Sequence, residues 1–389
     1  MDLMNGRIAA LDLSTGEVTE TQLDEDIVFA DPSCVSRANA IWKEHGEDSL
    51  VLGTGLLTGS LVPGACAGIV AGETGLMPVM GNFATELKLS GFDFIALTGT
   101  APAPGYVWVR DGIIEFVKSD AMRQLDSWGR TDRVRDDQGD RRIQVLAAGP
   151  WGDSGNPCAQ LVNCHWGGED KAGLGSRLAS KNVMAVAVRG MGELMVSDVE
   201  RHFQTCLELR SSLVSRLGPS KGLASYFDRA GKEDFSSLAH RDVACFGCPH
   251  PCRTFLKIAE DPKQMALSHR EPGYLHYDVP ALRKAFEVGL DARSATEILM
   301  MCARRGAEPV AVLERASSGG RQLTPAIVKD LLVAPWDMEP MPAKSYEGGF
   351  SIDRAVAIGL CPRLWGKAGF DPSAIGPCVE SALGRGVPM

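Results

Sequence analysis

The feature that most restricts the fold of this chain is a change of hydrophobic pattern near residue 197. Before this point, short apolar runs alternate with turn residues, which predicts strands joined by tight turns. After it, apolar residues recur every three or four positions, which predicts helices. We therefore expect an α+β chain, with a β-rich domain over residues 1–197 and a mainly helical domain over residues 198–389.

Local signals predict several of these elements directly. Asp111 and Gly112 separate two alternating runs, and this pair accepts the positive φ angles of a two-residue hairpin turn. Ser294 and Glu297 have the spacing of a capping box, which predicts that a helix begins there. The elements predicted in this way are hairpins over residues 8–20 and 106–117, buried strands at 143–148 and 183–188, and helices at 199–217, 279–289 and 294–304.

Charge and composition exclude several classes of function. With a net charge of −9, the chain has no surplus of Lys and Arg to neutralise phosphates, so we expect no nucleic-acid partner. Residues 49–72 carry no charge, but their six glycines and Pro63 predict turns and short strands rather than a membrane span. The first residues lack the basic and apolar segments of a secretory signal, so we expect a cytoplasmic protein with no membrane contact.

The chain has eleven cysteines, an odd number that suits a disulfide framework poorly. Three of them lie close together in Cys245-Phe246-Gly247-Cys248-Pro249-His250-Pro251-Cys252, a loop stiffened by its two prolines. Thiolates bind soft metals, so the loop suits an iron–sulfur cluster or zinc, and unligated thiols are a third alternative. Its spacing differs from the bacterial and plant-type ferredoxin runs.

A [4Fe–4S] cluster needs a fourth ligand, which a distant cysteine can supply. Cys361 is the best candidate, because a glycine two residues before it allows close approach and a proline follows it. Cys302 lies within a predicted helix and Cys378 lies near the end of the chain, so both are weaker candidates.

Several segments of the chain match one known family in the same order. They are residues 58–64 (TGSLVPG), residues 81–93 (GNFATELKLSGFD), residues 171–182 (KAGLGSRLASKN) with the strand that follows, the cysteine loop, and Gly359-Leu360-Cys361. On these motifs the chain resembles a shortened, divergent member of the aldehyde ferredoxin oxidoreductase family, which uses tungstopterin. The resemblance implies a [4Fe–4S] cluster with Cys245, Cys248, Cys252 and Cys361 as metal ligands. It also implies cofactor contacts at Lys171, Gly173, Gly175 and Gly359.

The chain departs from the family at positions that contact the pterin. Ala67 stands where an arginine is usual, and Pro78 stands where the family has an asparagine near a magnesium ion. Phe286 and Val356 replace the first aspartates of two pterin-binding motifs. An apolar side chain cannot accept from a pterin amine, and each buried donor left unpaired costs about 1–3 kcal/mol. We therefore expect neither tungstopterin nor molybdopterin to bind in the conventional way.

The sequence thus predicts an iron–sulfur oxidoreductase of this family's type, typical of anaerobic metabolism, that passes low-potential electrons through its cluster. Glu271, Tyr274 and His276 lie in a segment dense in acidic, basic and aromatic residues, and are candidates for proton handling. A solvated polar loop has the same composition. The expected partners are ferredoxin or another iron–sulfur protein, a small-molecule substrate of unidentified class, and further subunits of a homo- or hetero-oligomer.

Two other functions stay open at this point. The chain is a candidate for a non-catalytic electron-transfer or assembly subunit that has lost the pterin. It is also a candidate for a non-redox enzyme that uses an open iron of the cluster as a Lewis acid.

Overall fold

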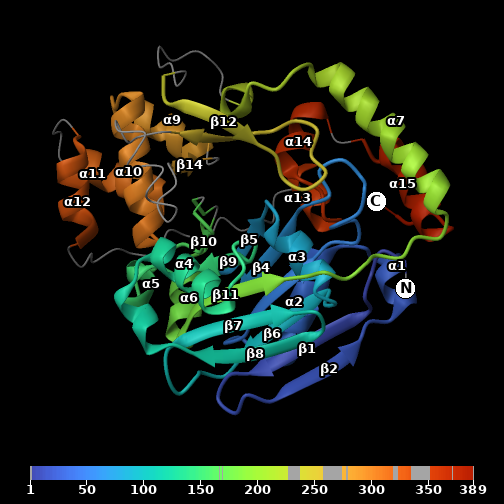
Figure 1. Cartoon of the computed structure of the whole chain (residues 1–389), viewed down its shortest axis with the longest axis horizontal. Helices are drawn as coiled ribbons and strands as arrows, with labels where there is room; N and C mark the ends of the chain where they lie inside the picture. The colour runs from blue at the N-terminus through green and yellow to red at the C-terminus, as the bar shows by residue number, and fades with distance from the viewer. Residues whose placement is uncertain are drawn as a thin grey trace.

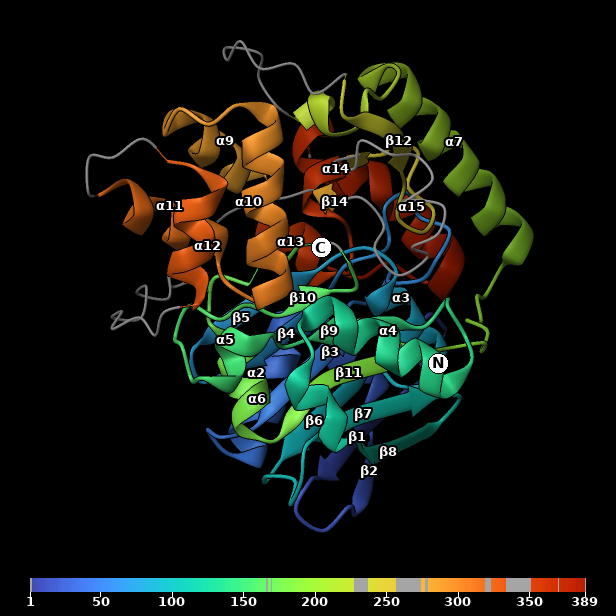
Figure 2. The same cartoon turned by 60° about the vertical axis from the view of Figure 1, so that its left-hand side comes forward.

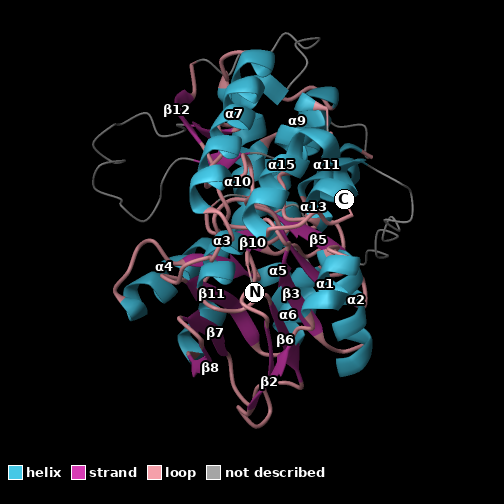
Figure 3. Ribbon diagram, turned by 90° about the vertical axis from the view of Figure 1, so that its right-hand side faces the viewer, coloured by secondary structure: helices cyan, strands magenta, loops and turns pink. Residues whose placement is uncertain are grey.

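The computed structural model describes residues 2–165, 167–168, 170–226, 237–256, 274–276, 279–318, 323–333, 351–369 and 371–388 of the 389-residue chain. Strands β1 to β11 precede residue 190, and helices dominate the described residues after it. Figures 1 and 3 show the strands gathered in one half of the molecule and the later helices in the other. The predicted α+β class is confirmed, while the domain boundary at residue 197 stays a prediction.

In the described part of the chain, six strands form a mixed sheet in the order β2-β1-β6-β3-β4-β5. Strands β1 and β6 run parallel, and the other neighbours run antiparallel. The uncharged segment 49–72 supplies two of these strands and the turns between them, as predicted. The strand bounds are β1 Arg7–Asp12, β2 Val18–Gln22, β3 Leu50–Thr54, β4 Gly68–Gly72, β5 Gly75–Val79 and β6 Phe94–Thr98.

A second sheet has the order β10-β9-β11-β7-β8 among the described residues. The predicted hairpin at its edge is confirmed, because β7 and β8 pair antiparallel across Asp111 and Gly112, whose φ angles are 42° and 82°. The predicted buried strands correspond to β9 and β11. The bounds are β7 Gly105–Arg110, β8 Ile113–Lys118, β9 Gln144–Ala147, β10 Val162–Asn163 and β11 Val183–Arg189.

The inner strands β3, β4 and β6 of the six-stranded sheet are buried on both faces, whereas the edge strand β2 is largely exposed. Alternate residues of β3 belong to different cores: Leu50 and Leu52 join a core shared with the second sheet, and Val51 joins a core shared with the C-terminal helices. All residues of β3 are therefore buried, and the strand lacks the alternation of apolar and polar residues that a half-exposed strand shows. The helices of this half are α1 Glu25–Ala30, α2 Cys34–His45, α3 Phe83–Leu89, α4 Ser127–Gln138, α5 Pro150–Asp153 and α6 Leu174–Ser180, with a 3₁₀ turn at Asp120–Gln124.

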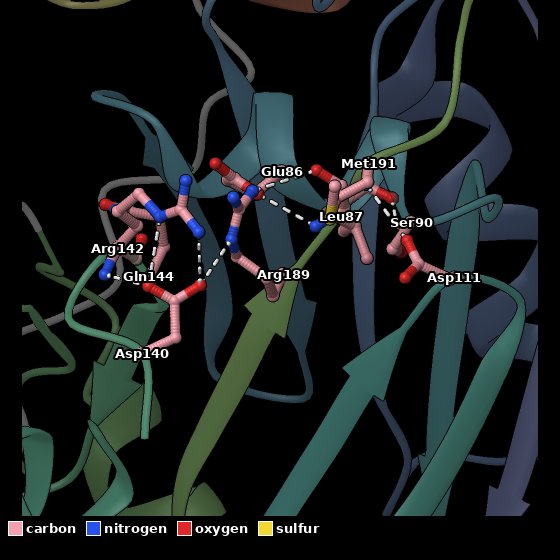
Figure 4. Close-up of polar contacts among 10 residues, drawn as sticks. Glu86, Leu87, Ser90, Asp111, Asp140, Arg142, Gln144, Arg189 and Met191 are labelled. Carbon is pink, nitrogen blue, oxygen red and sulfur yellow. Dashed lines mark hydrogen bonds and ion pairs between the residues drawn. The ribbon is translucent and has the colours of Figure 1, made fainter. Parts of the chain in front are cut away.

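An arginine at the end of β11 joins the two longest segments that carry the family resemblance (Figure 4). Arg189 Nη1 lies 3.0 Å from Glu86 Oε2 in α3, and Arg189 Nε lies 3.0 Å from Asp140 Oδ2. The Gly190 amide donates to the same Glu86 oxygen at 2.8 Å. These contacts fix α3, and with it the turn before α3, against the second sheet.

The described helices of the second half form two groups, with a small sheet between them (Figures 1 and 2). One group contains α9 to α12, and the other contains α7 and α13 to α15. The sheet pairs β12, β13 and β14 antiparallel. The bounds are α7 Val199–Leu217, β12 Ala239–Val243, β13 Arg253–Leu256, β14 Tyr274–His276, α9 Val279–Glu287, α10 Ala292–Arg305, α11 Pro309–Ser317, α12 Pro325–Val333, α13 Ser351–Ala357, α14 Pro362–Ala368 and α15 Pro372–Leu383, with a 3₁₀ turn at Gly222–Tyr226.

The predicted helices at 199–217 and 279–289 correspond to α7 and α9, but the predicted start of α10 is wrong. The helix begins at Ala292, and its N-cap is Asp291, whose carboxylate accepts from the Ser294 amide at 2.8 Å. Asp291 caps the helix one turn earlier than the Ser294 capping box would. None of the described helices is long and apolar enough to cross a membrane.

Candidate functional site

The three clustered cysteines lie on the connection between β12 and β13, which we call the cysteine loop (residues 244–252). Cys245 and Cys252 stand near its two ends, where antiparallel pairing of the strands brings the ends together. The Cys248 amide donates to the Cys245 carbonyl at 3.2 Å, and Gly247 has a φ of 62°, so the loop turns tightly at its tip. Cys245 and Cys252 are buried, whereas Cys248 is half-buried.

Cys361 belongs to the same group of thiols, although it is far away in the sequence. It is the N-cap of α14 and is 3% exposed. Its sulfur interacts electrostatically with those of Cys245, Cys248 and Cys252. The structure therefore brings together the four cysteines that the sequence singled out, and their role as ligands remains a proposal.

A fifth thiol that the sequence analysis did not single out lies in the same place. Cys66 is fully buried in the same hydrophobic core as Cys245 and Cys361, and these two thiols are the largest causes that raise its pKa. Its only signal in the sequence is its position two residues after the Pro63-Gly64 turn, which belongs to a family-like segment. A buried cysteine usually serves as a small apolar side chain, and so the sequence alone gave no reason to select it.

Two arginines supply positive charge to the site. The hydrogen bond from Cys66 is the largest cause that lowers the pKa of Cys245 to about 5, and the charges of Arg253 and Arg363 lower it further against the effect of burial. The pKa of Cys361 is also lowered, mainly by Cys66. Burial raises the pKa of Cys252 to about 12, and it raises that of Cys248 as well. The surroundings thus lower the pKa of Cys245 and Cys361 but not that of the equally buried Cys252.

The turn before α3 contacts the cysteine loop directly. The Gly81 amide hydrogen-bonds to Cys245, and Asn82 Oδ1 accepts from the Phe246 amide at 3.1 Å. Because the Glu86–Arg189 contacts anchor α3, this turn is a fixed support for the loop. Gly81 and Asn82 open the family-like segment 81–93, so the resemblance and the cysteine site meet here.

The donor set determines which metal group the site suits. Among the described residues, no group of three or more His, Cys, Asp or Glu side chains is arranged to hold a single metal ion. A [4Fe–4S] cluster binds one thiolate at each of four separate irons, so its ligands surround a group much larger than one ion. Four thiols from two distant segments, with Arg253 and Arg363 to offset thiolate charge, fit such a group.

The residues expected at a pterin phosphate are engaged with other parts of this chain. The Asp170 carboxylate accepts from the amides of Leu161, Ala172 and Gly175 at 2.9–3.1 Å, so it occupies the start of α6. Lys171 forms an ion pair with the buried Glu308, which caps α11. Gly173 and Gly175 contact the backbone carbonyls of Pro157 and of Ala159 and Gln160, respectively.

The other positions compared with the pterin pocket are also closed by packing. The Gly359 carbonyl accepts from the Ala67 amide at 3.0 Å, and Gly359 lies against Gly55 and Thr58. Val356 is buried in the same core as Cys361. Phe286 is partly buried and packs against two cores formed largely by the C-terminal helices, while Pro78 pairs with Ile69 between β4 and β5.

The proposed proton-handling residues are described only in part. Glu271 lies outside the described residues. Tyr274 and His276 form the ends of β14, and their backbones pair with Leu256 and Thr254 of β13. Because β13 follows Cys252 directly, this pairing sets β14 beside the base of the cysteine loop.

The two weaker candidates for the fourth ligand lie elsewhere. Cys302 is fully buried in a core of α10 and its neighbours. Cys378 in α15 hydrogen-bonds to Cys206 in α7. Neither Cys302 nor Cys378 has the electrostatic interactions with the cysteine loop that Cys361 has.

The chain is similar in sequence to proteins of known family. The family model described as "Aldehyde ferredoxin oxidoreductase, N-terminal domain" matches residues 8–190. The tungsten-containing aldehyde ferredoxin oxidoreductase of Pyrococcus furiosus is 27% identical over 297 residues, which cover 64% of this chain and 48% of that protein. The chain is therefore similar to the aldehyde ferredoxin oxidoreductase family, with the family's N-terminal domain matched over residues 8–190.

Other relatives show the same similarity. The tungsten-containing aldehyde ferredoxin oxidoreductase of Pyrococcus horikoshii is 26% identical over 64% of this chain and 48% of its own length. The aliphatic sulfonate oxidoreductase, WOR-like subunit, of P. furiosus is 25% identical over 49% of this chain and 35% of its own length. The chain spans about half the length of the tungsten-containing relatives that it matches.

A solved structure shows that the fold extends through the helical half. The active site complex BamBC of benzoyl coenzyme A reductase, in complex with 1,5 dienoyl-CoA, superimposes with a TM-score of 0.70. The match covers 96% of this chain and 65% of that chain, at 16% identity. The chain therefore shares the fold of that structure along almost its whole length.

Proposed function

We propose that this chain is an iron–sulfur oxidoreductase in which Cys245, Cys248, Cys252 and Cys361 hold a [4Fe–4S] cluster, without a conventional tungstopterin. The observation that carries the proposal is that Cys361, distant in sequence, lies buried against the thiols of the cysteine loop. The similarity to the aldehyde ferredoxin oxidoreductase family supports an oxidoreductase-type activity.

The residues of the site have separate tasks in this proposal. A bound cluster would supply one-electron transfer. The cysteine loop and the start of α14 hold the four thiolates, and the Gly81 amide donates a hydrogen bond to the Cys245 sulfur. Arg253 and Arg363 offset the negative charge that the thiolates bring into a buried site.

Conventional pterin binding does not fit the residues present. A pterin phosphate at the start of α6 would displace Asp170, whose carboxylate already holds amides there. The negative Asp170 carboxylate would also repel a phosphate bound at the start of α6. At the other anchor positions, Val356 and Ala67 are buried apolar side chains that offer neither a carboxylate nor a guanidinium.

Proton handling and electron partners complete the proposal. Glu271, Tyr274 and His276 remain our candidates for proton transfer, and the pairing of β14 with β13 supports a position near the cysteine loop. The expected electron partner is ferredoxin or another iron–sulfur protein. One relative is named a WOR-like subunit and the similar solved structure is a complex, which supports assembly with further subunits.

Metal analysis of the anaerobically purified full chain tests the cluster. We expect about four irons and four sulfides per chain, together with a brown colour. Cys248→Ala should lose most of the iron. Stoichiometric zinc without inorganic sulfide would contradict the proposal.

A matched pair of variants tests the fourth ligand. Cys361→Ser should lose or alter the cluster, whereas Cys378→Ser should retain it, because Cys378 contacts α7. The reverse result would show that Cys361 is not the ligand.

Metal analysis and a dye-reduction assay test the proposed absence of a conventional pterin. Protein from a host that makes the cofactor should contain no stoichiometric tungsten or molybdenum, and aldehyde-dependent reduction of viologen dyes should be absent. Tungsten at one atom per chain would refute this part of the proposal and leave the cluster assignment standing.

A further inference from the structure

Exposed apolar side chains are concentrated on one short stretch of the chain, residues 191–214. In the part of the chain that the structure describes, eleven large apolar side chains are exposed, and six of them belong to this stretch. These six are 41–72% exposed: Met191, Met195, Val199, Phe203, Leu207 and Val214. Single exposed apolar side chains are ordinary in soluble proteins, whereas a group of them marks an interaction surface.

Four of the six side chains form a stripe along α7. At 3.6 residues per turn, Val199, Phe203, Leu207 and Val214 lie within about 80° of one another around the helix, and we call them the exposed stripe. A different face of α7 packs inwards on α15, where His202 Nδ1 donates to the Cys378 carbonyl at 3.0 Å. Figures 1 and 2 both show α7 at the outer edge of the molecule, so the exposed stripe is accessible to another protein.

Opposite charges border the exposed stripe at different points along α7. Glu200 lies in the first turn of the helix, and Arg210 lies in its second half. By the same helical geometry Arg210 falls within the arc of the stripe, and Glu200 falls at its edge. Neither side chain forms an ion pair with another residue in the part of the chain that the structure describes. Arg201 differs, because its guanidinium faces Glu380 of α15 at 3.7 Å.

This pattern is self-complementary when two α7 helices lie antiparallel. In such a pair, a step towards the start of one helix matches a step towards the end of the other. If Phe203 of one copy faces Leu207 of the other, then three positions further out Glu200 faces Arg210. Two-fold symmetry repeats each contact, so both copies bury their apolar side chains and pair both charges.

We propose that the exposed stripe of α7 binds a second copy of this chain, with the two α7 helices antiparallel. Phe203 of each copy packs against Leu207 of the other at the centre of the interface. On either side, Glu200 of one copy meets Arg210 of the other. The antiparallel arrangement also sets the positive end of each helix dipole beside the negative end of the other. Met191 and Met195 extend the apolar surface beyond the start of the helix.

Sedimentation velocity of the full-length chain over a range of concentrations tests the dimer. We expect the wild type to sediment with twice the mass of one chain. Phe203→Glu should raise the dissociation constant about 30-fold, as the loss of a central interface side chain does. Val333→Glu is the matched control, because Val333 is 65% exposed at the end of α12, on the opposite side of the molecule from α7 in Figures 1 and 2. The control should dimerise like the wild type.

Charge reversal tests the antiparallel register. Glu200→Arg and Arg210→Glu each turn two attractions into two repulsions, and each should raise the dissociation constant about tenfold at low salt. The double variant again has opposite charges facing each other, so it should dimerise like the wild type. In a parallel pair each residue would face its own copy, and neither single reversal would weaken the dimer. All of these side chains are exposed, so the urea midpoints of the variants should stay near that of the wild type.

Three results would overturn the inference. The first is a wild type that stays monomeric at the highest soluble concentration, which would leave the stripe to a different partner. The second is a dimer that Phe203→Glu leaves intact, because another surface would then hold it. The third is a double charge variant that dimerises no better than the single variants. The iron and sulfide content of the same samples tests the proposed function separately, because neither result requires the other.

Discussion

Gly55 is a position at which one added methyl group should disturb the cysteine site from a distance. An alanine Cβ there would lie well under 3.0 Å from the Gly359 N and Cα atoms, a separation that real Cβ atoms essentially never show. The obstructing atoms are backbone, so no side-chain rotation can relieve the contact. Gly55 does not have a positive φ, and its own backbone therefore accepts alanine without strain. The cost of Gly55→Ala comes from this collision alone.

The magnitude follows from the contacts that hold the two segments together. The Leu57 amide donates to the Ile358 carbonyl at 2.8 Å, and the Ala67 amide donates to the Gly359 carbonyl at 3.0 Å, so separating them strains both bonds. Overpacking of this kind costs about 1–3 kcal/mol, and we expect the upper end because neither backbone can yield easily. Urea unfolding followed by circular dichroism measures the loss from the shift of the midpoint.

Gly366→Ala is the matched control in α14. Nothing lies within 4 Å of a Cβ at Gly366, and its φ is not positive. Alanine should stabilise this helix by about 0.5–1 kcal/mol through backbone entropy. Gly55→Ala should also lose iron, because it displaces the turn that carries Cys361, and Gly366→Ala should not. A Gly55→Ala protein as stable as the wild type, within about 0.5 kcal/mol, would refute the reasoning.

Three further experiments test other parts of the structure. Lys88 and Asp93 form a fully buried ion pair with an N–O distance of 2.7 Å, so Lys88→Met should cost about 3–5 kcal/mol in urea unfolding, and Lys88→Met with Asp93→Leu should recover much of the loss. Burial raises the pKa of Asp170 to about 6 from 3.8, so the folded state binds more protons between these values and stability falls as pH rises through them. Asp170→Asn should remove about 3 kcal/mol of this fall, measured as the change in unfolding free energy from pH 4 to pH 7. Asp291→Ala should cost about 1 kcal/mol as the loss of an N-cap, and Ser294→Ala should cost less in the same assay.

The parts of the fold that were predicted correctly depend on short-range chemistry. The β7–β8 hairpin follows from the Asp111-Gly112 turn, and α7 follows from its apolar spacing, because neighbours in the sequence determine both. The capping box failed for a related reason. Two capping groups, Asp291 and Ser294, compete within one turn, and the tertiary position of the chain decides between them.

The candidate site shows where local reasoning stops. Three of its cysteines were visible as a spaced group, and the fourth, Cys361, was selected by its neighbouring glycine and proline and then by the family resemblance. The sheet that carries the loop was not predicted, since all of β12 is exposed or half-exposed and lacks an apolar alternation. Cys66 enters the site through long-range packing. Arg253 and Arg363 follow Cys252 and Cys361 closely in the sequence, but their charges were not singled out there.

The cysteine site depends on both halves of the chain at once. Residues 64–67 and the turn at Gly81 come from the β-rich half, and the cysteine loop and α14 come from the helical half. The first half is held by the Glu86–Arg189 contacts, while the loop is held by the pairing of β12 with β13. Since metal binding to such a site requires these segments to be assembled, its binding free energy contributes to the folding of both halves. At the positions where the family resemblance implies a pterin, this chain makes contacts within itself: Asp170 accepts from the Gly175 amide, Glu308 pairs with Lys171, and the Ala67 amide donates to the Gly359 carbonyl. In our proposal a cluster held by the thiols joins the two halves of the chain, and these internal contacts stand where a pterin would otherwise bind.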